Sequence, residues 1–230
     1  MSDQPTPRTV TPPSPLSPLA HIRFEALGFA VGSVLFAAGA LTAQFASSSL
    51  QAANIEFAAG AVCFTAAAAV QAWVARENQV AAVGPWHVRD AFRNPDWLSA
   101  VAQFIGTLYF NVMTIRALVD PYVDPQQANH EIWRPDLLGS VLFLVSSLIA
   151  WHPVSRERRH GHVQRRSVWI CQANLYGSIA FGVSVIGARY LVDGQLRNPA
   201  VANWATFVGA VFFFLGAILL LPRWNPRPSR

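Results

Sequence analysis

The sequence contains few charged residues. Only 13% of its 230 residues are Asp, Glu, Lys or Arg, whereas soluble domains usually carry about 25%. In contrast, 53% of the residues are hydrophobic, and all 17 basic residues are arginines. This composition excludes a soluble globular protein and indicates that most of the chain lies in lipid.

Sequence patterns typical of enzymes and metalloproteins are also missing. The two cysteines, Cys63 and Cys171, both lie in apolar segments, so they predict neither a disulfide framework nor a metal site. The sequence has no phosphate-binding glycine loop, nucleophile elbow, His-Glu-x-x-His motif or pair of carboxylates within an apolar segment. We therefore expect no enzymatic activity, no bound metal and no cofactor.

The two ends of the chain differ in composition from the rest. Residues 1–20 contain six prolines among Ser and Thr, a composition typical of disordered segments. This segment is a poor signal peptide, because the apolar run that follows is too long for a cleavable one. We expect a disordered tail over 1–20, a transmembrane domain over 21–224 and a short basic tail over 225–230.

Six apolar segments follow the proline-rich tail. A helix needs about 20 apolar residues to cross the hydrocarbon core, and segments of this length without period-2 alternation are helices. The fourth segment is short, but it could span the membrane if it extends over 136–154. The sequence predicts an all-α integral membrane protein with six transmembrane helices, arranged as hairpins at about 24–76, 97–154 and 167–222. The apolar segments are 26–45, 57–75, 97–115, 137–151, 167–188 and 201–222.

The distribution of arginine predicts the orientation in the membrane. If both termini are cytoplasmic, 13 arginines lie in inner regions and 4 lie in outer loops. Cytoplasmic loops of membrane proteins carry an excess of basic residues. We therefore expect a multi-pass protein of the cell membrane with a cytoplasmic N-terminus and a cytoplasmic C-terminus.

Each predicted helix contains the motif Gly-x-x-x-Phe, which suggests three copies of one helical hairpin. Gly and Phe four residues apart lie on one helix face, and small residues allow helices to approach closely in lipid. We expect a role in helix packing, and the alternative is a substrate groove lined by the glycines. The pairs are Gly32 with Phe36, Gly60 with Phe64, Gly106 with Phe110, Gly139 with Phe143, Gly177 with Phe181, and Gly209 with Phe213.

A few polar side chains interrupt the predicted helices. Gln103 and Asn174 each precede a motif glycine by three residues, and Asn111 follows on the third helix. Such amides can join helices by hydrogen bonds or form a polar substrate site between the third and fifth helices. Glu25 and Glu56 lie near predicted helix starts, where we expect them at the interface.

Charged residues at the helix ends form two patterns. Arg116 with Asp120, and Arg189 with Asp193, have the i,i+4 spacing of ion pairs on a helix. Both pairs are expected at the outer surface, as interfacial ion pairs or as an outer gate that contacts anions. The fourth loop carries five further arginines, which favour contact with anionic lipid head groups on the cytoplasmic side. These are Arg156, Arg158, Arg159, Arg165 and Arg166.

The histidines of the same loop, His152, His160 and His162, do not predict a metal site, because arginines surround them and no carboxylate or thiolate completes a ligand set. Nucleic-acid binding is not expected either, since the basic patch is short and lies between two helices.

The segment Gln103-Phe-Ile-Gly106-Thr107-Leu-Tyr-Phe110-Asn111, followed by Leu138-Gly139-Ser140-Val-Leu-Phe143, resembles the YrhK-like family of small bacterial membrane proteins. The resemblance is best over residues 97–151. It is weaker over the other two hairpins, and the first hairpin departs from the pattern because Phe29 stands where the other hairpins have Gln103 and Asn174. The resemblance implies a domain of the bacterial inner membrane and supplies no catalytic residues.

Two functions remain compatible with these features. The first, which we expect, is a non-catalytic packing or scaffold protein that self-associates or binds another membrane protein. The second is a small transporter or channel, although three repeats do not form the paired inverted halves of many transporters. A polar cavity reaching the membrane midplane would favour transport, and a closed centre filled with phenylalanine would favour the scaffold.

Overall fold

The computed structural model describes residues 18–46, 50–85, 87–120, 124–160 and 164–222. It is 88% helical, without a β-strand in these ranges. Six of the helices are long and apolar enough to cross a membrane. The predicted all-α fold with six membrane-spanning helices is therefore confirmed for the described residues.

The long helices are connected by short segments, two of which contain further helical turns. The short elements are α3 (Val88–Ala91), α5 (Pro125–Ala128) and a π-helix, η2 (Asn129–Trp133), which leads directly into α6. The long helices are α1 (Pro18–Phe45), α2 (Leu50–Val83), α4 (Pro95–Val119), α6 (Arg134–Arg159), α7 (Arg165–Gly187) and α8 (Pro199–Leu220).

Several helices extend beyond the predicted apolar segments, because a helix continues past the lipid wherever its backbone hydrogen bonds are satisfied. Helix α1 begins at Pro18, inside the segment predicted as a tail, since proline is tolerated in the first turn. The span predicted as short is part of a 35-residue helical segment from Pro125 to Arg159. The rest of the proline-rich tail and the basic tail at 225–230 lie outside the described residues.

Side-chain caps mark the starts of two long helices. The side chain of Asn94 accepts hydrogen bonds from the backbone N–H groups of Asp96 and Trp97, at 2.9 and 3.2 Å, and Pro95 follows it. Asn198, followed by Pro199, caps α8 in the same way. An Asn cap followed by proline satisfies a free N–H group and fixes the first turn.

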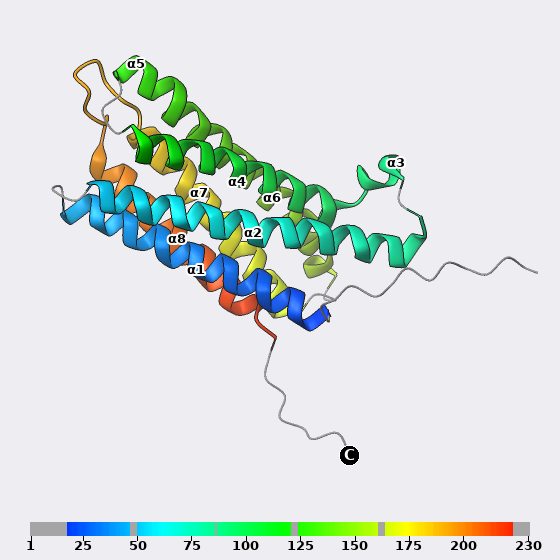
Figure 1. Cartoon of the computed structure of the whole chain (residues 1–230). Coiled ribbons are helices and arrows are strands. Elements are labelled where there is room, and N and C mark those ends of the chain that lie inside the picture. The colour runs from blue at the N-terminus through cyan, green and yellow to red at the C-terminus, as the bar shows by residue number, and fades with distance from the viewer. Residues whose placement is uncertain (1–17, 47–49, 86, 121–123, 161–163, 223–230) are drawn as a thin grey trace, which may run out of the picture.

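The six long helices form a closed ring. Extensive contacts join α1 to α2, α2 to α4, α4 to α6, α6 to α7, α7 to α8, and α8 back to α1. Both described chain ends and α3 lie at one end of this bundle, and α5 lies at the opposite end (Figure 1). We refer to these as the α3 end and the α5 end.

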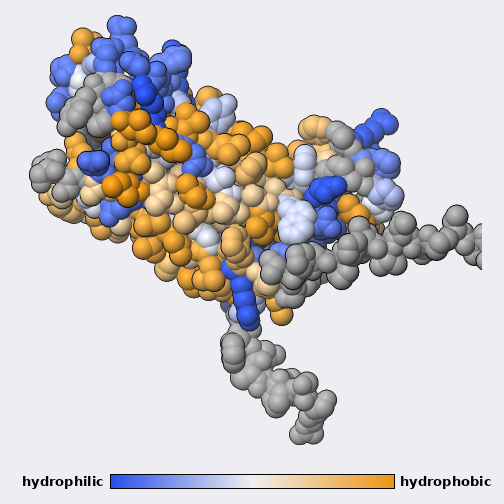
Figure 2. All heavy atoms as spheres, in the orientation of Figure 1, coloured by the Kyte–Doolittle hydropathy of each residue, from blue (hydrophilic) through white to orange (hydrophobic). Residues whose placement is uncertain are grey.

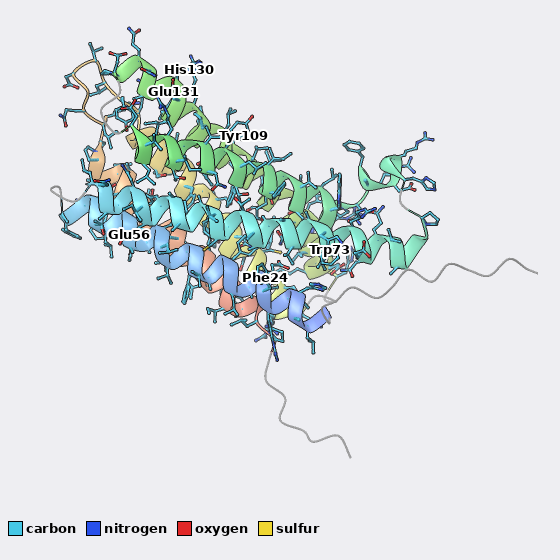
Figure 3. All side chains as sticks on the ribbon, in the orientation of Figure 1. Phe24, Glu56, Trp73, Tyr109, His130 and Glu131 are labelled. Atoms are coloured by element: carbon cyan, nitrogen blue, oxygen red, sulfur yellow. The ribbon has the colours of Figure 1, made fainter. Side chains whose placement is uncertain are left out.

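On the face shown in Figure 2, an apolar band crosses the bundle between two hydrophilic ends. On α1, for example, Leu27, Val31 and Val34 are exposed at successive turns. Such a surface would be unstable in water but is suited to contact with lipid. Figure 3 places Trp73 toward the α3 end of the bundle, and His130 and Glu131 at the α5 end. The chain is therefore a polytopic membrane protein.

Candidate functional site

Six phenylalanines, one from each long helix, meet inside the ring in two triangular layers. Phe36, Phe110 and Phe181 form one layer, with ring centroids 5.7–6.2 Å apart. Phe64, Phe143 and Phe213 form the other layer, with ring centroids 5.5–6.4 Å apart. All six side chains are buried, so this phenylalanine double layer closes the centre of the ring.

The motif glycines allow the two helices of each hairpin to approach. An ideal Cβ atom on Gly32 would lie 2.7 Å from the ring of Phe64, and one on Gly60 would lie 2.7 Å from the ring of Phe36. Each phenylalanine therefore packs on the glycine of the partner helix. The same exchange joins Gly106 to Phe143, Gly139 to Phe110, Gly177 to Phe213, and Gly209 to Phe181.

A small cavity of about 60 Å³, with four polar side chains in its lining, lies against the Phe64 layer, toward the α3 end. Gln103 of α4 and Asn174 of α7 both line it, so the structure brings these two predicted residues into one cavity. The Gln103 side-chain oxygen accepts a hydrogen bond of 3.4 Å from Ser146. We call this space the inner cavity.

Asn111, the third residue of the predicted polar site, lies elsewhere. Its amide donates hydrogen bonds to the hydroxyl of Thr65 and, at 2.9 Å, to the carbonyl of Thr107. Asn111 is on α4 and Thr65 is on α2, so the side chain links two neighbouring helices. It does not line the inner cavity, because it lies more than two turns beyond Gln103 along α4.

A larger cavity lies next to the inner cavity, at the α3 end. This vestibule has a volume of about 840 Å³ and is lined by the ends of α2 and α4 and by the segment between them. Glu25 and Gln71 line both spaces. These two residues therefore lie between the vestibule and the inner cavity, and we call their position the neck.

A third cavity, of about 150 Å³, lies on the opposite side of the double layer, against the Phe36 layer. Its polar lining includes the buried carboxyl group of Asp136, with Asn54 and Asn203. Burial raises the pKa of the Tyr190 hydroxyl, which lines the same cavity, and the nearby Asp136 raises this pKa further. Cavities with several polar lining residues therefore lie on both sides of the double layer.

Sequence reasoning did not identify Glu25, Gln71 or Asp136 as site residues. Glu25 was expected at a helix start, but α1 begins seven residues earlier and the residue is only 7% exposed. For Glu25 and Asp136, the sequence did contain a signal, which was their spacing from the motif glycines. Glu25 precedes Gly32 by two helical turns, and Asp136 precedes Gly139 by three residues, as Gln103 precedes Gly106.

One of the two predicted ion pairs is present. Arg116 contacts the carboxylate of Asp120 at 3.4 Å and also pairs with Glu131. The predicted pair of Arg189 with Asp193 does not form within the described residues. Helix α7 ends at Gly187, so a spacing of four residues no longer places the two side chains on one face.

Both members of the missing pair have other contacts. The guanidinium carbon of Arg189 lies 5.6 Å from the centre of the Trp133 ring, a distance typical of a cation–π contact. The side chain of Asp193 accepts a hydrogen bond of 3.0 Å from the backbone of Gln195. Neither residue is therefore available for the ion pair that the spacing predicted.

The arginines of the fourth loop lie at the α3 end, and their surroundings differ. Arg166 donates hydrogen bonds to the carbonyl oxygens of Leu219 and Leu221, so it caps the end of α8. The other four, Arg156, Arg158, Arg159 and Arg165, are exposed. Of the nearby histidines, His162 lies outside the described residues.

Comparison of the chain with protein-family models, curated proteins and solved structures finds no significant match. The structure itself assigns the chain to a broad class. Within the described residues, it is an all-α polytopic membrane protein whose six long helices enclose a plugged central axis.

Proposed function

We propose that this chain is a small membrane transporter or channel whose pathway follows the axis of the helix ring. The observation that supports the proposal is the pair of cavities, each with several polar lining residues, on the two sides of the phenylalanine double layer. Polar and ionisable side chains inside a membrane bundle are costly and usually mark the route of a polar solute. The double layer would then be the closed gate of this route.

The Phe64 and Phe36 layers each form a wall of one cavity. A constriction lined by apolar rings excludes water and so prevents the passage of hydrated solutes. A scaffold has no need of buried carboxyl groups such as Glu25 and Asp136 in its cavities. The closed centre filled with phenylalanine is the arrangement expected of a scaffold, and the proposal of transport is supported instead by the cavities with polar lining residues on both sides of this centre.

The proposal is tested by flux through the purified protein in liposomes. Phe213→Ser places a hydroxyl in the closed layer, and we expect the flux of small ions to increase severalfold as the gate becomes hydrated. Phe212→Ser is the matched control, because Phe212 contacts Tyr176 and lies outside the double layer. Equal flux in folded Phe213→Ser, the control and the wild type would contradict the proposal.

The second candidate function is a membrane scaffold, which the tight contact between glycines and phenylalanines supports. In this case the double layer would only hold the ring together. Phe213→Ser would then lower stability without changing flux, and the purified protein would self-associate or retain another membrane protein. Native mass spectrometry of the protein in detergent would distinguish a self-associated protein from a complex with another membrane protein by mass.

We further propose the orientation with the α3 end in the cytoplasm. The exposed Arg156, Arg158, Arg159 and Arg165 lie at this end and would contact anionic lipid head groups. The vestibule would then open to the cytoplasm. The absence of catalysis, cofactor and nucleic-acid binding, and membership of the YrhK-like family in the bacterial inner membrane, are further proposals that rest on the sequence.

A further inference from the structure

We propose that Glu25 and Gln71 form a binding site for a small monovalent cation at the neck between the vestibule and the inner cavity. The inference rests on the proposed axial pathway and names the class of solute that the pathway carries. It is argued from the geometry of the neck, from its charge and from the size of the inner cavity.

The neck combines a buried carboxylate with a free amide oxygen. Glu25 is 7% exposed and lines both cavities together with Gln71. The side-chain oxygen of Gln71 is buried and has no hydrogen-bond partner. A buried polar atom without a partner carries a substantial cost, and a bound cation would remove this cost while neutralising the carboxylate.

The charge around the neck favours a cation. Among the described residues that line the inner cavity, Glu25 is the one acidic residue and no Arg or His is present. The vestibule adds the carboxylates of Asp90 and Asp96 against one arginine, Arg93. A cleft with an excess of one charge raises the local concentration of the opposite ion, so the vestibule would concentrate cations at the neck.

The ligand set indicates a monovalent ion. Carboxylate and amide oxygens are hard ligands, but calcium and magnesium sites usually contain several carboxylates or a substrate phosphate. No group of three His, Cys, Asp or Glu residues that could hold a metal occurs in the described part of the chain. The single carboxylate, that of Glu25, balances one positive charge. The amides of Gln71, Gln103 and Asn174, which also line the inner cavity, are neutral.

The size of the inner cavity excludes a bulky solute. Its volume is about 60 Å³, and a water molecule occupies about 30 Å³ in the liquid. The cavity therefore has room for a small ion with one or two waters, and not for a sugar, nucleotide or peptide. Sodium and potassium ions fit both this volume and the oxygen ligands.

The test measures thermal unfolding of the full-length protein in detergent, in sodium, potassium or N-methylglucamine chloride at equal ionic strength and pH. We expect sodium or potassium to raise the Tm by about 5–10 °C over N-methylglucamine when the ion is at about a hundredfold excess over its Kd. Glu25→Gln and Gln71→Met should each abolish this shift. Glu77→Gln is the matched control, because Glu77 is exposed on the same helix as Gln71.

Three results would overturn the site. The first is an equal Tm in all three salts for the wild type. The second is a Tm shift in Glu25→Gln or Gln71→Met equal to that of the wild type. The third is a wild-type Tm that changes with pH and not with the cation, if this change is lost in Glu25→Gln. The Glu25 carboxyl group would then bind a proton in place of the cation. If Glu25→Gln does not fold, Gln71→Met and the wild type still decide the question.

Flux measurements on the same preparations separate this inference from the proposed function. Flux in Phe213→Ser without any Tm shift in sodium or potassium would contradict the cation site and leave the axial pathway intact. A Tm shift that is lost in Gln71→Met, without flux in Phe213→Ser, would support the site and contradict transport.

Discussion

The ring of Phe36 fills the space that a side chain on Gly60 would need, because an ideal Cβ atom there would lie 2.7 Å from the phenylalanine Cδ2 atom. The carbonyl oxygen of Gly32 would lie 3.0 Å from the same Cβ. Gly32 in turn receives the ring of Phe64. The two helices of the first hairpin therefore exchange rings across a pair of glycines, and the other two hairpins repeat this exchange.

We expect Gly60→Ala to destabilise the protein by about 1–3 kcal/mol, the usual cost of adding atoms to a filled core. The Phe36 ring and the Gly32 carbonyl would both have to move. Unfolding in detergent with increasing SDS, followed by circular dichroism, measures the change. Gly182→Ala is the control, because a Cβ there meets no atom within 4 Å. Equal stability of the two variants would show that the close approach at Gly60 is not required.

Asn111 and Thr65 should be energetically coupled, because the Asn111 amide donates a hydrogen bond to the Thr65 hydroxyl between α4 and α2. We expect Asn111→Ala to reduce stability, with a coupling energy to Thr65→Val of about 1 kcal/mol. A double-mutant cycle in the same unfolding assay measures this coupling. If the effects of the two substitutions on the free energy of unfolding are additive, the hydrogen bond does not contribute to stability.

The proposed orientation predicts different labelling at the two ends. In a variant with Cys63 and Cys171 replaced by alanine, Arg158→Cys at the α3 end should react with a membrane-impermeant maleimide only after the cells are opened. Val192→Cys, near the α5 end and fully exposed, should react in intact cells. Labelling of Arg158→Cys in intact cells would reverse the orientation.

The path of each helix was largely predictable from local sequence, while its ends were less so. Apolar runs of about 20 residues located the six spans, because the cost of leaving backbone groups unpaired in lipid makes each span a helix. The fifth apolar segment was expected to end at 188, one residue after α7 ends at Gly187, so the expected pairing of Arg189 with Asp193 was wrong because it required the helix to continue beyond this segment. Whether an i,i+4 spacing brings two charges together depends on the helix continuing between them.

The candidate site was predicted in part. Gln103 and Asn174 share the inner cavity, as their matched positions suggested, but Glu25 and Gln71 were missed and Asn111 lies at a helix interface instead. Hydropathy could not distinguish Glu25 at an interface from Glu25 in a cavity. This distinction depends on Gln71, which is 46 residues away on another helix.

The sequence by itself determined the lipid environment, the six helices and the glycine and phenylalanine spacing, because each depends on residues within a few turns of one another. Only the tertiary structure decided that Phe36 packs on Gly60 and that the six rings form two layers. It also decided that cavities with polar lining residues lie on both sides of the double layer. These features require the ring to close from α8 back to α1. Closure is the sum of many weak packing contacts between segments far apart in the chain, and no local pattern contains it.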